Sequence, residues 1–135
     1  MSGEMIKKAN ELLKNCNDGS FSVMDENGYP SASAIWLLGQ EDIKEIYFST
    51  HIGSNKYKRV QNGGKASINC YSDFHNLTLV GDAVVMTDQE TKTKYWQEMF
   101  AHVYPKGDTD PTYCIIKFTT KRVSAHIDEE IGFTL

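Results

Sequence analysis

The sequence has no apolar run of the roughly 18 to 20 residues that a membrane-spanning helix needs. Residues 1–10 also lack the apolar centre of a signal peptide, so we expect a cytoplasmic protein with no membrane partner. Cysteine is scarce, with three residues at Cys16, Cys70 and Cys114. Their odd number and wide spacing argue against a disulfide framework and against a thiolate metal site. We therefore expect these thiols to be reduced and buried.

An excess of positive charge is missing as well. The 14 lysines and arginines are outnumbered by 18 aspartates and glutamates, which gives a formal net charge of −4. Nucleic-acid binders usually show a basic balance, so we expect no nucleic-acid partner. The chain has no internal repeat and no low-complexity tract, and its 135 residues are in the usual range for one folded unit. These features predict a single domain over residues 1–135.

Two segments show the apolar spacing of an amphipathic helix. The first covers about residues 3–16. The second covers about residues 89–103, and Asp88 offers an N-cap directly before it. Its apolar face would consist of Tyr95, Trp96, Met99, Phe100 and Val103. A third, shorter helix is expected after Ser54, ending at the Gly63–Gly64 pair.

The remaining apolar segments have the length and turn residues of strands joined by hairpins. The predicted strand regions are residues 20–38 (two strands around Asn27–Gly28), 45–50, 65–72, 76–87 and 112–128 (two strands or one long bent strand). Six or seven strands with few crossover helices cannot form a doubly wound parallel sheet. The sequence therefore predicts a mainly β fold, a small antiparallel barrel with flanking helices.

One segment reverses the overall charge. No acidic residue lies between Glu45 and Asp73, whereas four basic residues give this window a formal charge of +4: Lys56, Lys58, Arg59 and Lys65. The helix start at Ser54 would present free backbone N–H groups. Together with the hydroxyls of Thr50 and Ser54 and the ammonium of Lys56, it forms a candidate phosphate site. The alternative is that the basic side chains are a solvated face of a surface helix.

The sequence gives little indication of metal binding or of nucleophilic catalysis. The four histidines, His51, His75, His102 and His126, do not have the spacing of metal ligands, so no metal site is expected. No Ser or Cys lies in a recognisable nucleophile motif, and we assign no catalytic residue. His51 is the histidine near the candidate phosphate site; it would either bond the phosphate or lie in solvent, and we favour solvent.

Four stretches carry a resemblance to a known family: "DENGYPSASAIWLL", "YFSTHIGSNKYKRVQNGGKASI", "VGDAVVMTDQE" and "YPKGDTDPTYCIIKF". In this order they resemble the FMN-binding split barrel of the pyridoxamine 5'-phosphate oxidase-like superfamily, closest to its general stress protein 26 branch. The resemblance spans about residues 5–127. It implies a six-stranded split β-barrel and a homodimer with one FMN in each of two clefts shared between the subunits.

The resemblance also implies site residues. The phosphate-binding positions of the family match Thr50, Ser54, Asn55 and Lys56, and Lys56 would be the main charge on the phosphate. Ser33 stands where the family often has a phosphate-binding Arg, and Asn55 stands where oxidase members often have Arg. Because each missing guanidinium would remove about 1.5 to 3 kcal/mol, these two residues predict weaker FMN binding.

Further positions match the flavin ring and the partner subunit. Ala34, Ile35 and Trp36 fall where the family lines the ring. For Trp36 the alternative is a core position, which we favour. The resemblance implies that three residues reach the partner's flavin cleft: Tyr104, Lys106 and Tyr113. Gly81 matches a glycine that the family uses for close packing.

The leading hypothesis is an FMN-dependent oxidoreductase that reduces a small acceptor, with a small-molecule electron donor or acceptor as its partner. A true pyridoxamine phosphate oxidase is not expected, because such enzymes need basic residues near the C-terminus, where this chain has Asp128, Glu129 and Glu130. Three alternatives stay open: a non-catalytic flavin-binding or flavin-sequestering stress protein, a haem binder and a deazaflavin binder.

Overall fold

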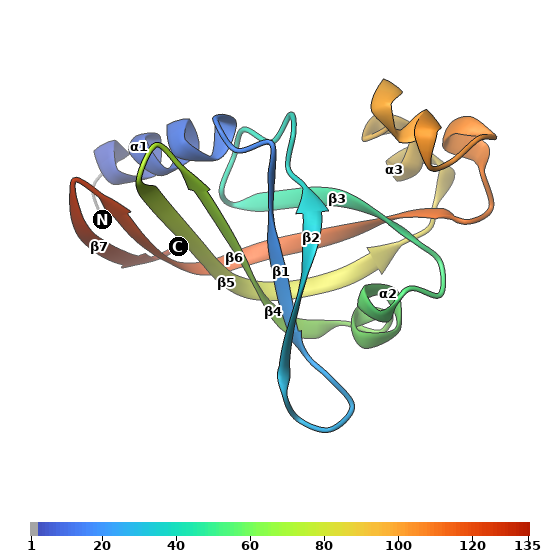
Figure 1. Cartoon of the computed structure of the whole chain (residues 1–135), viewed down its shortest axis with the longest axis horizontal. Coiled ribbons are helices and arrows are strands. Elements are labelled where there is room, and N and C mark those ends of the chain that lie inside the picture. Colours follow the sequence, from blue (N-terminus) through green and yellow to red (C-terminus); the bar gives the residue numbers. More distant parts are fainter. Residues whose placement is uncertain (1–2) are drawn as a thin grey trace.

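Antiparallel strands are the main regular element of the computed structural model, which describes residues 3–135 (Figure 1). The strands are β1 (Asp18–Met24), β2 (Pro30–Trp36), β3 (Glu45–His51), β4 (Gly64–Ser72), β5 (His75–Met86), β6 (Tyr113–Ile127) and β7 (Glu129–Thr134). The helices are α1 (Gly3–Lys14), α2 (Asn55–Val60) and α3 (Gln89–Lys94). None of the helices among the described residues is both long and apolar enough to span a membrane.

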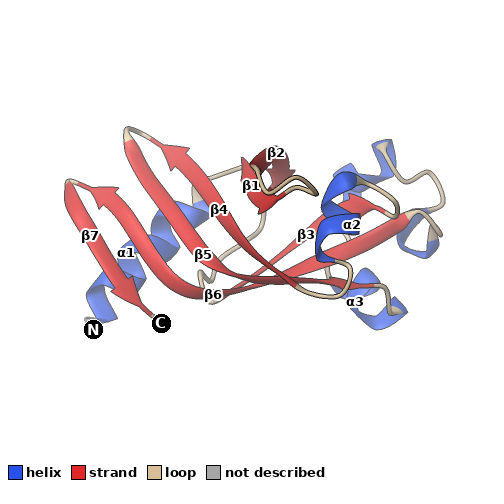
Figure 2. Ribbon diagram, turned by 90° about the horizontal axis from the view of Figure 1, so that it is seen from below, coloured by secondary structure: helices blue, strands red, loops and turns tan. Residues whose placement is uncertain are grey.

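The strands form one sheet in the order β2-β1-β4-β5-β6-β3, and β7 pairs with β6 beside this path. All pairs are antiparallel. The sheet curves strongly, so that β3 and β6 run beneath the β1–β2 hairpin (Figure 2). Within the described chain β2 and β3 end the order and are not paired with each other, so the barrel is open there. The predicted mainly β, split-barrel fold is confirmed.

The C-terminal strands extend further than predicted. The region 112–128 forms one long strand, β6, which is one of the two alternatives predicted for it, and the following residues form β7, for which the sequence analysis assigned no element. The sheet has seven strands, whereas the resemblance implied a six-stranded barrel. A register shift lies between Val80 and Gly81, where a Cβ on Gly81 would come within 2.0 Å of the Thr119 carbonyl oxygen. The prediction that Gly81 serves close packing is confirmed.

The predicted helix over residues 89–103 is also wrong in its second half. Asp88 caps its start, since its carboxylate accepts a hydrogen bond from the Thr91 N–H at 3.0 Å. The α-helix then ends at Lys94, and a separate 3₁₀ turn covers Glu98–His102. The Tyr95 ring lies 3.9 Å from the Tyr47 ring, centroid to centroid. Because aromatic residues are weak helix formers, packing of this kind overrides the local periodicity.

The buried side chains form two groups. The main core lies between α1 and the sheet and is largely aliphatic; its largest fully buried members are Phe21, Phe48, Phe118, Leu13, Leu37, Ile43, Ile46, Ile68, Leu77 and Leu79. The aromatic cluster is smaller and lies under the segment after α3; its members include Trp36, Tyr47, Tyr95, Trp96, Phe100, Tyr104 and Tyr113. All three cysteines are free and buried, as expected.

Candidate functional site

A cavity of about 240 Å³ lies where the barrel is open, between the edge strands β2 and β3. Residues 34–36 of β2 form one wall and residues 49–51 of β3 form the opposite wall. Lys56 of α2, Asp18 of β1 and residues 103–104 complete the lining. Residues far apart in the sequence therefore meet at this one place, and both candidate stretches of the sequence analysis contribute to it.

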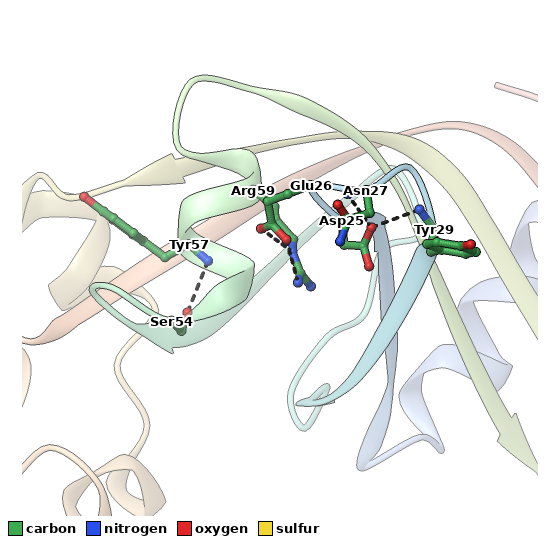
Figure 3. Close-up of polar contacts among 7 residues, drawn as sticks. All are labelled: Asp25, Glu26, Asn27, Tyr29, Ser54, Tyr57 and Arg59. Atoms are coloured by element: carbon green, nitrogen blue, oxygen red, sulfur yellow. Dashed lines mark hydrogen bonds and ion pairs between the residues drawn. The ribbon is translucent and has the colours of Figure 1, made fainter.

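The turn between β3 and α2 is held by hydroxyl groups. The Ser54 hydroxyl accepts a hydrogen bond from the Tyr57 N–H at 3.1 Å (Figure 3). It also lies 2.8 Å from the Thr50 hydroxyl. Ser54 is thus the N-cap of α2, as predicted. Thr50 is buried and lines the cavity. This bonding fixes the start of α2 beside the cavity and thereby positions Lys56.

The four basic residues of this segment have different surroundings. Lys56 lines the cavity, and burial lowers the pKa of its ammonium group. Arg59 pairs instead with Glu26 in the β1–β2 turn, with Arg59 Nε 3.3 Å from Glu26 Oε1 (Figure 3). Lys58 and Lys65 are exposed and do not line the cavity. Both interpretations of the charge therefore hold in part: Lys56 lines the cavity, whereas Lys58 and Lys65 are solvated and Arg59 is paired with Glu26.

Lys56 has no counter-ion among residues 3–135, where no ion pair includes it. Charged groups that are partly buried are stabilised by an opposite charge or by hydrogen bonds to the charged form. An anion in the cavity would supply that partner. The donors available there, an ammonium and the Thr50 hydroxyl, fit the oxygens of a phosphate group.

Trp36 fits both alternatives considered for it, a core residue and a residue that lines the cofactor site. Its ring stacks on Phe100 at a centroid distance of 5.6 Å and an interplanar angle of 14°, so it packs against the aromatic cluster. It also lines the cavity with its neighbours Ala34 and Ile35. The aromatic cluster therefore fixes the position of one cavity wall.

Tyr104 and His51 are neighbours in the lining of the cavity. Their rings are 4.8 Å apart, and burial raises the pKa of Tyr104 to about 12, so the phenol is neutral at physiological pH. His51 lines the cavity while remaining exposed to solvent. Tyr113 is buried, and its hydroxyl donates to the Lys92 carbonyl at 2.9 Å. Its predicted contact with a partner's cleft stays a prediction.

Several candidate residues do not reach the cavity. Ser54 is occupied as the N-cap, Asn55 is exposed at the start of α2, and Ser33 lies on β2 without lining the cavity. Lys106 does not line it either, and its backbone N–H donates to Asp110. The predicted roles of these residues in cofactor binding stay predictions.

The acidic C-terminal residues lie elsewhere in the fold. Asp128 stands between β6 and β7, 3.6 Å from His75 across the turn of β4 and β5, and Glu129 and Glu130 begin β7. None of the three lines the cavity of its own chain. The repulsion that the sequence analysis expected them to exert on a phosphorylated substrate therefore has no counterpart in this cavity.

Sequence reasoning missed three lining residues, Asp18, Ser49 and Val103, and Asp18 is the charged one among them. It begins β1 and pairs across the strands with Trp36. Nothing in its local sequence marks it, because only the β1–β2 pairing brings it beside the cavity wall. Within the described part of the chain, no group of three or more His, Cys, Asp or Glu side chains is arranged to hold a metal ion.

The open antiparallel sheet and the cavity between its edge strands define a split-barrel protein with a cationic group in its cleft. The chain belongs to the pyridoxamine 5'-phosphate oxidase family, whose model matches residues 5–127. No curated protein matches it at the level of sequence.

Solved structures agree with this family. A Clostridium acetobutylicum protein related to general stress protein 26, of the pyridoxinephosphate oxidase family, aligns over 100% of this chain and 97% of its own with 25% identity and a TM-score of 0.88. A general stress FMN/FAD binding protein from Xanthomonas citri aligns over 95% and 92% with 18% identity and a TM-score of 0.78. A heme binding protein from Mycobacterium smegmatis aligns over 99% and 59% with 16% identity and a TM-score of 0.74.

Proposed function

We propose that this chain is an FMN-binding flavoprotein whose cavity between β2 and β3 holds the cofactor. The observation that carries the proposal is Lys56, a partly buried cation that lines this cavity beside the Thr50 hydroxyl and forms no ion pair with any of the described residues. In this arrangement Lys56 and Thr50 bind the phosphate. The family and the FMN/FAD-binding stress protein of similar fold support the same assignment.

The flavin ring lies along Ala34, Ile35 and Trp36 in this proposal. These residues end the edge strand β2, whose outer edge is not paired with another strand of the described chain. Edge strands keep free backbone N–H groups, which can donate hydrogen bonds to the carbonyl oxygens of the flavin pyrimidine ring. The Trp36 ring adds an apolar surface, and its stacking on Phe100 holds it in place.

The affinity expected for FMN is moderate. Ser33 and Asn55 supply no guanidinium, and neither lines the cavity, so Lys56 is the main charge available to the phosphate. The cavity of one chain is also open on one side. In our proposal a second copy of the chain covers it, which gives a homodimer with two shared flavin clefts.

We infer an oxidoreductase that reduces a small acceptor, because bound FMN supplies electron or hydride transfer and the protein needs only to bind and orient it. The chain's own part is to hold the phosphate at Lys56, to fix the ring against Trp36 and to exclude water with Tyr104. A non-catalytic flavin-binding stress protein would use the same contacts, and the two differ only in turnover with a reduced nicotinamide and an acceptor.

A second candidate is haem binding. His51 lines the cavity and is exposed, and a histidine of this kind can be an axial ligand of haem iron. The fold is shared with a heme binding protein. A Soret band in the purified protein, shifted by His51→Ala, would favour this candidate over FMN.

The first experiment is an absorption and fluorescence titration of the purified protein with FMN. We compare the native protein with Lys56→Ala and, as a matched control, Lys58→Ala, which removes an exposed lysine from the same helix. Lys56→Ala is expected to weaken binding about ten- to a hundredfold, since it removes a charge-assisted hydrogen bond. Lys58→Ala leaves binding within about twofold. Equal affinity of all three proteins would contradict the proposed phosphate site.

Oligomeric state and turnover are measured separately. Light scattering is expected to give the mass of a dimer, and a monomeric mass would exclude the shared cleft. Oxidation of reduced nicotinamide by the FMN-loaded protein, with quinone or nitro compounds as acceptors, tests the oxidoreductase. Stoichiometric flavin without turnover would leave the non-catalytic binder as the function.

A further inference from the structure

The cavity carries two opposite charges. Lys56 and Asp18 both line it, and they come from different elements, α2 and β1. The phosphate site proposed above uses only Lys56. A carboxylate in a cavity that is to hold a phosphorylated ligand needs an explanation, because it repels an anion placed near it.

The two groups lie at different walls of the cavity. Lys56 lies shortly after the end of β3, where Thr50 lines the same cavity. Asp18 is the first residue of β1 and pairs with Trp36, the last residue of β2, which the proposal above places along the flavin ring. The carboxylate therefore lies beside the wall of the ring and not beside Thr50.

We propose that Asp18 is a specificity-determining residue that accepts a hydrogen bond from the imide N–H of the flavin ring. This proposal rests on the flavin binding proposed above and adds the direction in which the ligand lies. The phosphate binds at the Lys56 end of the cavity and the pyrimidine edge of the ring points to Asp18. The cavity thereby selects a ligand with an anion at one end and a hydrogen-bond donor at the other.

The chemistry of the two ends fits this orientation. An ionised carboxylate only accepts hydrogen bonds. The imide N–H of a flavin is a hydrogen-bond donor, and it lies on the ring at the end of the ligand away from the phosphate. Asp18 lines the cavity and is exposed to solvent, so its carboxylate is not forced into a dry environment. A ligand with anionic groups at both ends would bring one of them against Asp18 and would bind less tightly.

The test compares two ligands that differ only in the phosphate, FMN and riboflavin. We measure the dissociation constant of each for the native protein, Asp18→Ala, Lys56→Ala and the control Asp82→Ala. Asp82 is an exposed acid on β5 that does not line the cavity, so its removal makes the same change in net charge. Thermal unfolding of each variant shows that all four proteins are folded.

Asp18→Ala is expected to weaken FMN and riboflavin equally, by about ten- to a hundredfold, because both ligands carry the same imide. Lys56→Ala is expected to weaken FMN and leave riboflavin unchanged. Asp82→Ala changes neither. Tighter binding of FMN by Asp18→Ala, or no change with either ligand, would overturn the proposal while leaving the proposed flavin binding intact. A native protein that binds neither ligand would overturn both.

A second readout separates a direct contact from a structural effect. A carboxylate beside the pyrimidine ring opposes the negative charge that the flavin gains on reduction. The midpoint potential of FMN bound to Asp18→Ala is therefore expected to be more positive than that of FMN bound to the native protein. A change in packing alone would not move the potential in this direction, and an unchanged potential would count against contact with the ring.

Discussion

The main core and the aromatic cluster both fill buried space, but they do so with different kinds of side chain. The main core fills the space between α1 and the sheet with aliphatic residues and three phenylalanines. The aromatic cluster fills the space under residues 95–113 with stacked and edge-on rings, several of which carry a polar group. Tyrosine and tryptophan combine a large apolar surface with a hydrogen-bonding tip, so they suit a region next to a cavity.

The cavity lies at the border of these two groups. Ile35 belongs to the main core, while Trp36 and Tyr104 belong to the aromatic cluster, and all three line the cavity. Because of this position, substitutions in the two groups should have different effects. Substitutions in the main core are expected to change the free energy of unfolding, and substitutions in the aromatic cluster are expected to change the shape of the cavity as well.

The largest expected effect is in the main core. Phe21 is fully buried and its ring lies 5.0 Å from that of Phe48, centroid to centroid. Phe21→Ala removes the ring and leaves a cavity, which typically costs about 3 to 5 kcal/mol of unfolding free energy. Urea denaturation followed by circular dichroism measures this, with the exposed neighbour Ser20→Ala as the control. A loss below about 1 kcal/mol would mean that the main core is not the principal source of stability.

Alkaline pH distinguishes the two regions, because the buried tyrosines lie only in the aromatic cluster. Burial raises the pKa of Tyr104 to about 12 from an ordinary 10.0. Between these values the unfolded chain releases the proton and the folded chain keeps it, so stability is complete below pH 10 and is lost as pH rises toward 12. The native protein should lose up to about 2 to 3 kcal/mol more than Tyr104→Phe over this window.

Denaturation curves at a series of pH values measure this difference. The buried cysteines also titrate in alkali, but they are present in both proteins, so their contribution cancels in the comparison. Parallel stability profiles for the two proteins would show that the Tyr104 phenol titrates as it does in the unfolded chain.

A matched pair of substitutions sharpens the comparison further. Phe100 makes ring contacts with four neighbours: Trp36, Trp96, Tyr104 and Tyr113. Phe118 in the main core is equally buried, and among the described residues it forms no aromatic pair. Phe118→Leu is expected to cost less than about 1.5 kcal/mol. Phe100→Leu should cost at least about 1 kcal/mol more, since aromatic pairs contribute beyond their buried area.

Both variants are unfolded in urea and titrated with FMN. Only Phe100→Leu is expected to weaken FMN binding, because it removes the ring on which Trp36 stacks. If Phe118→Leu weakens binding to the same extent, the cavity wall depends on the whole barrel instead of on the aromatic cluster.

The smallest expected effect lies outside both regions. Phe74 in the β4–β5 turn has a φ of 67° and is 86% exposed, so its backbone is strained and its ring packs on little. Left-handed backbone costs about 1 to 2 kcal/mol for a residue with a side chain. Glycine avoids this cost but loses about 0.4 to 1 kcal/mol through its freer unfolded state. Phe74→Gly should therefore raise stability by about 0.5 to 1 kcal/mol, which thermal unfolding detects.

Phe74→Ala is the control for this last prediction. It removes the same exposed ring but keeps a Cβ, so the backbone strain remains and no gain is expected. A gain of equal size in both variants would trace the effect to the ring instead of to the backbone. Neither variant should change FMN binding.

The sequence predicts those parts of the fold that local signals determine. The caps at Ser54 and Asp88 are side-chain groups that act within one turn, and the helix starts were predicted correctly for that reason. The end of α3 depends on Tyr95 stacking on Tyr47, a contact between distant segments, and it was missed. The strand β7 was missed as well, since Glu129, Glu130 and Gly132 are poor strand formers and the strand exists only by pairing with β6.

The candidate site was predictable to a similar degree. Thr50, Lys56 and residues 34–36 were singled out from a charge pattern and a family resemblance, and the structure brings them to one cavity. Ser33 and Asn55 matched family positions but lie outside it. Asp18 could not be found in this way, because its place at the cavity follows from its pairing with Trp36.

The strand order also has a consequence for the time course of folding. β2 and β3 are consecutive in the sequence, yet they occupy opposite ends of the order β2-β1-β4-β5-β6-β3. β3 pairs with β6, more than sixty residues further along the chain, so its docking closes a long loop and is expected to be slow. The space between β2 and β3 exists only after every strand between them has paired. In a refolding experiment, capacity to bind a ligand should therefore return in the last kinetic phase, after most of the secondary structure has formed.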